Sequence, residues 1–240
     1  MKKVFYSLAL ICFMLSGIVQ AQKMDDVIKL FNEAAEKTNK GDYQTAISDF
    51  EKVLEVGAAV GDSANDLVSK SKEQLPVLYW QVAAAQLKQR KFEEAIPTLE
   101  KTVEYATAFE NNAATRERAE KMLPQVYTAV ATQKFRDKDF NGAVEVYDKA
   151  IKQDSNNSKA YLGKGLAYAE LKNEKNMVES LEKAIQLSKA ENDPKTAETA
   201  VQKLTRYYTD LGDEELANLD PVDKDFSVAI EFYNKTLAYD

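Results

Sequence analysis

The stretch KGDYQTAISDFEKVL at residues 40–54 decides the fold, because close variants of it occur four more times. The variants are RKFEEAIPTLEKTV at 90–103, KDFNGAVEVYDKAI at 138–151, KNEKNMVESLEKAI at 172–185 and KDFSVAIEFYNKTL at 224–237. Repetition at intervals of a few tens of residues is typical of stacked supersecondary units, each of which needs its neighbours to bury its apolar face. We therefore interpret the chain as a repeat array.

Aligned on one another, the five copies fill the same columns with the same kind of side chain. Large apolar residues recur at offsets of three and four, which predicts a helix with one apolar stripe. A small residue precedes them, and a small side chain lets a second helix approach closely. The small column holds Ala46, Ala95, Ala143, Met177 and Ala229; the next holds Ile47, Ile96, Val144, Val178 and Ile230.

A second helical stretch lies ahead of each copy. In four of these stretches an aromatic residue is followed at helical spacing by Ala or Gly: Tyr79, Tyr127, Tyr161 and Tyr208. Short polar turns join the two stretches, and Asp42 and Asp139 stand where each would cap the second helix. Each unit is thus predicted to be an antiparallel pair of helices.

This pattern resembles the tetratricopeptide repeat, most clearly from Tyr161 to Ala184 after the turn DSNN at 154–157. The resemblance implies an all-α, right-handed α-solenoid of about five antiparallel helix pairs, covering residues 22–240. The units are expected at about 24–56, 62–106, 112–153, 158–188 and 194–240. The sequence departs from the family at Met177 in the small column, and at Lys37, Gln86 and Lys134 where the family usually has a second Tyr.

Three added segments, at 61–75, 111–123 and 192–204, begin with polar residues and continue as helical pattern. We expect them to extend the first helices of their units by two to three turns. Pro76 and Pro124 should kink two of these long helices, because proline lacks an N–H. Pro194 follows Asp193 and fits the first position of a helix.

The first 21 residues have the pattern of a secretory signal: two lysines, an apolar run from Val4 to Val19, and a cleavage site after Ala21. The run is shorter than a spanning helix needs, which disfavours the alternative of a membrane anchor. Export predicts a periplasmic or secreted protein with no membrane span after cleavage.

Composition disfavours several classes of function. The net charge of −7 is unfavourable for binding nucleic acid or anionic membrane surfaces. The chain has no His, and its one Cys, Cys12, lies in the predicted leader. Without that leader the chain lacks the commonest general base, the commonest metal ligand and the thiol nucleophile. We expect no enzyme, metal or cofactor; a hydrolase using carboxylates alone is the remaining enzymatic alternative.

The resemblance implies a binding groove lined by the first helices. The positions that would face it are Phe31, Val77, Trp80, Leu87, Lys88, Thr128, Phe135, Arg136, Leu162 and Leu166. Trp80 would anchor a partner there; the alternative is that the kink at Pro76 turns it into the core. Some family members grip a terminal carboxylate with Lys and Asn at two positions that are Phe31 and Ala35 here, so that activity is not expected.

The predicted function is a scaffold that binds a protein or peptide in a cell-envelope complex, by shape and apolar burial. The alternative is a receptor for a small solute or a glycan, with the groove aromatics as a stacking platform. Ile230 and Leu237 form a separate candidate surface, because no repeat follows them in this sequence to cover their columns. This stripe would dock a partner or a second copy of the chain, unless Phe226, Tyr239 and residues 216–225 fold over it.

Overall fold

The computed structural model describes residues 23–110, 112–219 and 225–239 of the chain. The predicted leader, its cleavage site after Ala21 and Cys12 lie outside these ranges. The described residues form helices and turns, and no strand occurs among them. The chain divides into two compact units, one up to Leu123 and one from Pro124 onward, and each is described by itself.

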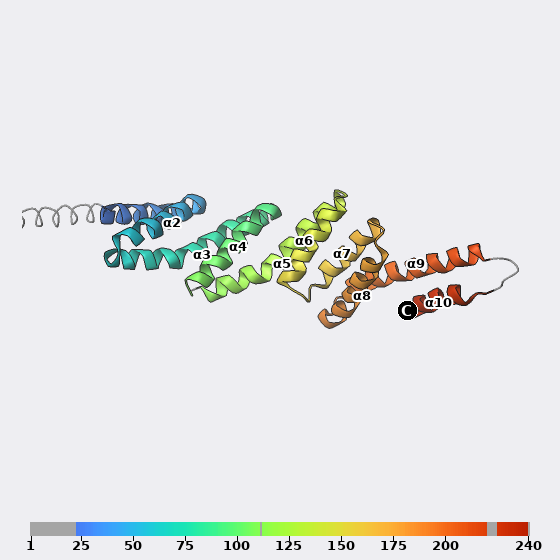
Figure 1. Ribbon diagram of the computed structural model, residues 1–240. Helices are drawn as coiled ribbons and strands as arrows, with labels where there is room; N and C mark the ends of the chain where they lie inside the picture. Colours follow the sequence, from blue (N-terminus) through green and yellow to red (C-terminus); the bar gives the residue numbers. More distant parts are fainter. Residues whose placement is uncertain (1–22, 111, 220–224, 240) are drawn as a thin grey trace, which may run out of the picture. The chain divides into compact units, whose positions relative to one another are not determined.

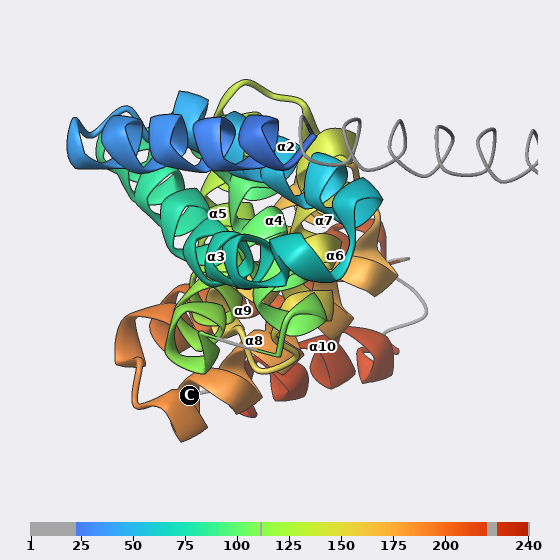
Figure 2. The same cartoon turned by 90° about the vertical axis from the view of Figure 1, so that its left-hand side faces the viewer.

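Unit 1 contains a helix at 23–39, then α2 (Tyr43–Val60), a short 3-10 helix η1 (Asp62–Ala64), α3 (Asn65–Lys88) and α4 (Phe92–Ala108). The first part of α5 (Ala113–Arg136) also belongs to it. In this unit α3 packs against both α2 and α4. The helices can be followed from blue to green in Figures 1 and 2.

The core of unit 1 lies between the helix at 23–39, α2 and α3. Phe50, Leu75 and Leu78 are almost fully buried there. Phe31 meets Phe50 edge to face, with ring centroids 5.6 Å apart. These contacts join the first helix pair to the second, so neither pair has to bury its apolar stripe alone.

Unit 2 continues with the rest of α5, then α6 (Phe140–Gln153), α7 (Ser158–Glu170), α8 (Glu174–Glu191), α9 (Pro194–Asn218) and α10 (Ser227–Leu237). Leu181 and Leu204 lie at the centre of its core. A Cβ atom on Gly165 would lie 2.7 Å from Cγ of Leu181, so glycine is required for α7 to approach α8 this closely. An all-helical fold built from consecutive helix pairs is thus confirmed.

The predicted helix starts are confirmed at three aspartates. The Asp42 carboxylate accepts a hydrogen bond from the backbone N–H of Thr45 at the start of α2, and Asp139 accepts one from Gly142 at the start of α6. Asp193 caps α9 in the same way, with Pro194 in the first turn. A side-chain oxygen at this position satisfies an N–H that has no partner inside the helix.

The added segments extend the first helices, as predicted. α3 and α5 have 24 residues each and α9 has 25, whereas α7 has 13. Both α3 and α5 are continuous helices, and they contain Pro76 and Pro124 respectively.

Candidate functional site

A hollow of about 260 Å³ lies in unit 1 between the helix at 23–39 and the first turns of α3. Its apolar floor comes from Phe31, Ala35 and Phe50, and polar side chains of α3 form its rim. Phe31, a predicted groove residue, therefore lines a hollow while its ring also packs on Phe50. The full lining is Phe31, Ala35, Thr38, Asn39, Phe50, Lys70, Glu73 and Gln74.

The predicted groove residues of α3 share one face of that helix. Each residue turns the helix by about 100°, so Trp80 lies on roughly the opposite side from the buried Leu75 and Leu78. Val77 and Leu87 fall on the Trp80 side, and all three side chains are half-buried. The structure therefore brings these three together in one stripe, called here the α3 stripe. The neighbouring Lys88 is exposed.

A hydrogen-bonded aromatic pair holds α2, α3 and α4 together. The hydroxyls of Tyr79 and Tyr105 both donate to Oε1 of Glu51, each at 2.7 Å. The two rings stack with centroids 5.4 Å apart. Burial, and then the hydrogen bond to Glu51, raise the pKa of both tyrosines well above the usual range. This network fixes the setting of α3, which carries the stripe.

The predicted site residues of α5 also have structural contacts. Thr128 Oγ1 accepts a hydrogen bond from the side chain of Asn157 at 3.1 Å, which ties α5 to the start of α7. Phe135 packs on Phe140 with ring centroids 5.4 Å apart. Arg136 is exposed at the end of the helix.

On α7, Leu162 and Leu166 lie four residues apart, so they are neighbours on one helix face. Both side chains are half-buried, and Leu162 packs against the cluster around Leu181 and Leu204. This pair is the counterpart in unit 2 of the α3 stripe.

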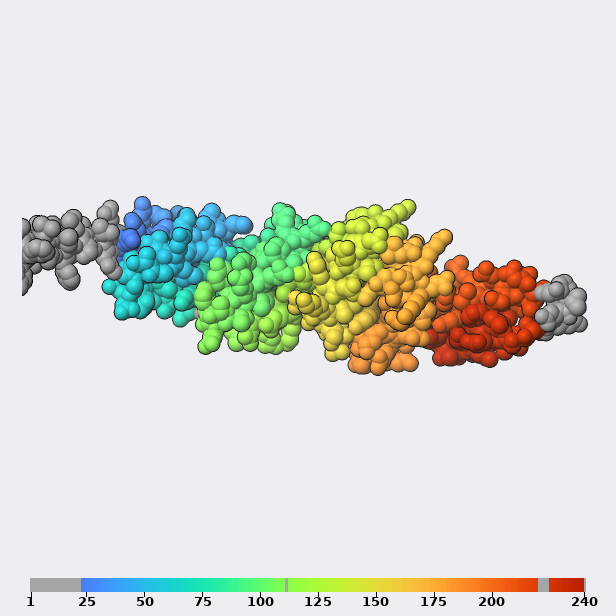
Figure 3. Space-filling model, viewed as in Figure 1, coloured from blue at the N-terminus to red at the C-terminus, as the bar shows by residue number. Residues whose placement is uncertain are grey.

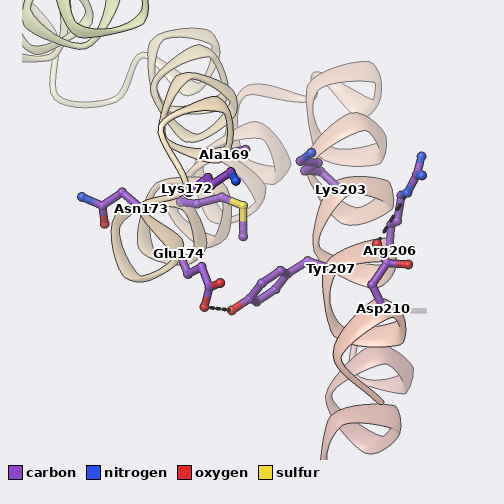
Figure 4. Close-up of a pocket in the computed structure, with 9 residues that line it drawn as sticks. Ala169, Lys172, Asn173, Glu174, Lys203, Arg206, Tyr207 and Asp210 are labelled. Carbon is purple, nitrogen blue, oxygen red and sulfur yellow. Dashed lines mark hydrogen bonds and ion pairs between the residues drawn. The ribbon is translucent and has the colours of Figure 1, made fainter. Parts of the chain in front are cut away.

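A second hollow, of about 230 Å³, lies in unit 2 between the α7–α8 turn and α9 (Figure 4). It was not predicted. We call it the turn pocket; its lining is Ala169, Lys172, Asn173, Glu174, Met177, Lys203, Arg206, Tyr207 and Asp210. The Tyr207 hydroxyl donates to Oε2 of Glu174 at 2.8 Å. Burial and this hydrogen bond raise the pKa of Tyr207 to about 12. The bond closes one side of the pocket and links α8 to α9.

The sequence held a signal for the turn pocket, but an incomplete one. Lys203 and Arg206 are three residues apart on one helix, so a basic face on α9 could have been noted. The repeat pattern does not specify that the turn residue Lys172 lies opposite that face. The position of Lys172 relative to that face depends on how α9 packs on α8.

The stripe on α10 is exposed, as expected from its sequence. Ile230 is 54% exposed and Leu237 66%, and Phe226 is 45% exposed. Tyr239 does not cover them: its ring stacks on Tyr208 with centroids 6.1 Å apart, and its hydroxyl donates to Glu182. Phe226 and Tyr239 therefore leave the stripe open, and residues 220–224, the other part of the predicted cover, lie outside the described residues. The surface of α9 and α10 appears in red in Figure 3.

Within the described ranges, no group of three or more His, Cys, Asp or Glu side chains is placed to hold a metal ion. No helix in those ranges is long and apolar enough to cross a membrane.

Comparison with known families agrees with this geometry. A profile described as TPR repeat matches residues 134–172, and a second described as tetratricopeptide repeat matches residues 158–191. Residues 134–191 of this chain thus carry tetratricopeptide repeats. The matched residues span α6, α7 and α8 with the last turn of α5, which is where the sequence pattern is most regular. No curated protein matches the chain.

Several solved structures of tetratricopeptide-repeat and other proteins are similar to this chain. MamA from Desulfovibrio magneticus RS-1 is 15% identical over 90% of this chain and 95% of its own, with a TM-score of 0.31. The TPR2AB domain of yeast Sti1, solved in complex with pHSP90, is 23% identical over 88% of this chain and 85% of its own, with a TM-score of 0.31. YrrB, described as a TPR protein with an unusual peptide-binding site, is 18% identical over 78% of this chain and 96% of its own, with a TM-score of 0.33.

Proposed function

We propose that this tetratricopeptide-repeat protein is an exported, non-catalytic scaffold that binds a segment of another protein in a cell-envelope complex. The observation that carries the proposal is the α3 stripe. Val77, Trp80 and Leu87 lie on a face of α3 that turns away from Leu75 and Leu78 and borders the buried Pro76, and all three are large and apolar. Half-buried aromatic and aliphatic side chains in one row are typical anchors for a partner chain.

The size of the hollows favours a protein segment over the alternative of a small solute or glycan. Sites for small molecules usually enclose about 300–1,000 Å³, whereas the two hollows measure about 260 and 230 Å³. Each hollow suits one or two side chains of a bound peptide. A solute that quenched the fluorescence of Trp80 and competed with no protein would instead support the receptor alternative.

Site-specific crosslinking tests the scaffold proposal. A photoreactive amino acid placed at Val77 or Leu87 should crosslink one defined partner in envelope extracts of the native host. The same amino acid at Glu93, which is exposed on α4, serves as the matched control. We expect Trp80→Ala to weaken crosslinking from both positions about tenfold or more, because the indole is the largest anchor. Equal labelling from Glu93, or no effect of Trp80→Ala, would reject the α3 stripe as the binding surface.

Export rests on the sequence of residues 1–21, and it has its own test. We propose that the mature chain begins at Gln22 and is found in the periplasm or outside the cell. The intact mass of the protein purified from each cell fraction gives the first residue directly. A protein found in the cytoplasm with residues 1–21 still attached would contradict export. The crosslinking result would be unaffected.

We also propose that the α10 stripe is a second contact surface, for a partner or a second copy of this chain. Ile230 and Leu237 are the most exposed large apolar side chains among the described residues. Replacing both by Lys should lower the mass measured in solution or abolish capture of the crosslinked partner. If neither changes, the stripe is not an interface.

A further inference from the structure

The turn pocket in unit 2 combines an apolar floor with a basic rim. Met177 is 3% exposed and forms the floor together with Ala169 and the ring of Tyr207. Lys172 extends from the α7–α8 turn, while Lys203 and Arg206 extend from α9 on the other side (Figure 4). The pocket therefore places three cations around a small apolar surface.

The two carboxylates of the turn pocket are already engaged, and two of its cations are not. Glu174 accepts the hydrogen bond from Tyr207, and Asp210 lies 3.8 Å from Nε of Arg206. Lys172 and Lys203 have no ion-pair partner among the described residues. Two unpaired ammonium groups at one hollow repel each other, and an anion bound between them would relieve that repulsion.

From this arrangement we infer that the turn pocket binds an acidic peptide segment, in which a carboxylate side chain pairs with Lys172 and Lys203 and an adjacent apolar side chain lies on Met177 and Tyr207. The volume of about 230 Å³ accommodates one or two side chains. The net charge of −7 does not oppose this binding strongly, since salt screens charges beyond about 8 Å under physiological conditions.

This inference rests on the proposed function as a protein-binding scaffold, and it names the chemistry of one bound segment. It concerns a different surface from the α3 stripe, because every lining residue belongs to unit 2. The two proposals can therefore fail separately.

The test uses the full chain and a short blocked peptide of alternating Glu and Leu, with a peptide of alternating Gln and Leu as its control. Calorimetry should detect binding of the Glu-Leu peptide and no binding of the Gln-Leu peptide. The affinity for the Glu-Leu peptide should fall as the salt concentration rises. Lys172→Glu and Lys203→Glu should each weaken binding about tenfold or more, since each removes a charge-assisted contact. Lys175→Glu makes the same charge change on the first turn of α8, at an exposed side chain that does not line the pocket, and should change affinity less than threefold.

Chemical shifts of backbone amides locate the peptide. Changes confined to the α7–α8 turn and the middle of α9 would support the inference. Four results would overturn it. The two peptides could bind equally, or neither could bind; Lys175→Glu could weaken binding as much as Lys172→Glu does; or free glutamate could bind as tightly as the peptide. Circular dichroism and thermal unfolding establish that the variants are folded, and Lys203→Ala repeats the test without adding a negative charge. If the α3 stripe crosslinks a partner while the acidic peptide does not bind, this inference fails and the proposed function stands.

Discussion

Single side chains in this protein often link helices through a tyrosine hydroxyl and a carboxylate. Tyr79 and Tyr105 share Glu51, Tyr207 bonds to Glu174, and Tyr239 bonds to Glu182. In each case a ring fills apolar space while its hydroxyl finds a charged acceptor, so burying the phenol leaves no polar group unsatisfied. The same arrangement favours the neutral phenol over the phenolate. Stability should therefore fall at alkaline pH, where tyrosine ionises.

The pKa of Tyr207 is raised to about 12, by burial and then by Glu174, above the usual value near 10. Because the folded-state pKa is higher than the unfolded one, this contribution to stability is complete below about pH 10 and is lost as pH rises toward about 12. The free energy of unfolding measured with denaturant should therefore fall between about pH 8 and about pH 11. In the Tyr207→Phe variant this free energy should fall less steeply with pH. The comparison is of slopes, since Tyr207→Phe also loses the bond to Glu174. Identical slopes would contradict this cause.

At the level of helices, the caps set where each repeat begins, and one cap also joins two helices. The Asn157 side chain accepts a hydrogen bond from the N–H of Ala160 and donates one to Thr128 Oγ1. Asn157 thus ends the turn DSNN, caps the start of α7 and links α7 to α5. Two of the departures from the family pattern form ion pairs: Lys37 pairs with the buried Asp49, and Lys134 pairs with Asp139.

Asn157→Ala should lower the free energy of unfolding by about 1 kcal/mol or more, because it removes a helix cap together with a contact between helices. Asn156→Ala is the matched control, since Asn156 is an exposed neighbour in the same turn. Its effect should stay within about 0.5 kcal/mol. Urea unfolding of the three proteins measures both values, and equal effects would show that the cap does not act as described.

Over the length of the chain, stability depends on contacts between helices that are close in sequence. The packed pairs within the described units include α2 with α3, α3 with α4, α7 with α8 and α8 with α9. Such an array behaves as a row of units coupled to their neighbours, and it can open locally. The protein should therefore respond to a core mutation mainly near that mutation.

Leu204→Ala removes a fully buried side chain from the core of unit 2, and Leu75→Ala does the same in unit 1. Each should cost about 2–5 kcal/mol where it acts. Hydrogen exchange should show lost protection in α8 and α9 for Leu204→Ala, and in α2 and α3 for Leu75→Ala. Uniform loss of protection along the chain in both variants would mean that the units unfold together.

Much of this architecture could be predicted from the amino-acid sequence, because the physical causes are local. Offsets of three and four define an apolar helix face, Asp42, Asp139 and Asp193 define helix starts, and glycine at Gly165 marks a close approach. The tetratricopeptide repeats matched at residues 134–191 follow from the same spacing. The α3 stripe could also be anticipated, since helix periodicity alone separates Trp80 from Leu75 and Leu78.

The surfaces that carry the functional proposals required the tertiary structure. Whether Tyr239 covers Leu237 or stacks on Tyr208 depends on distances between helices, which no local pattern specifies. The turn pocket exists because α9 packs on α8 and places Lys203 and Tyr207 against a turn some thirty residues earlier in the chain. Helix formation depends on neighbours three and four residues away, whereas a pocket depends on side chains that only the packing of separate helices brings together.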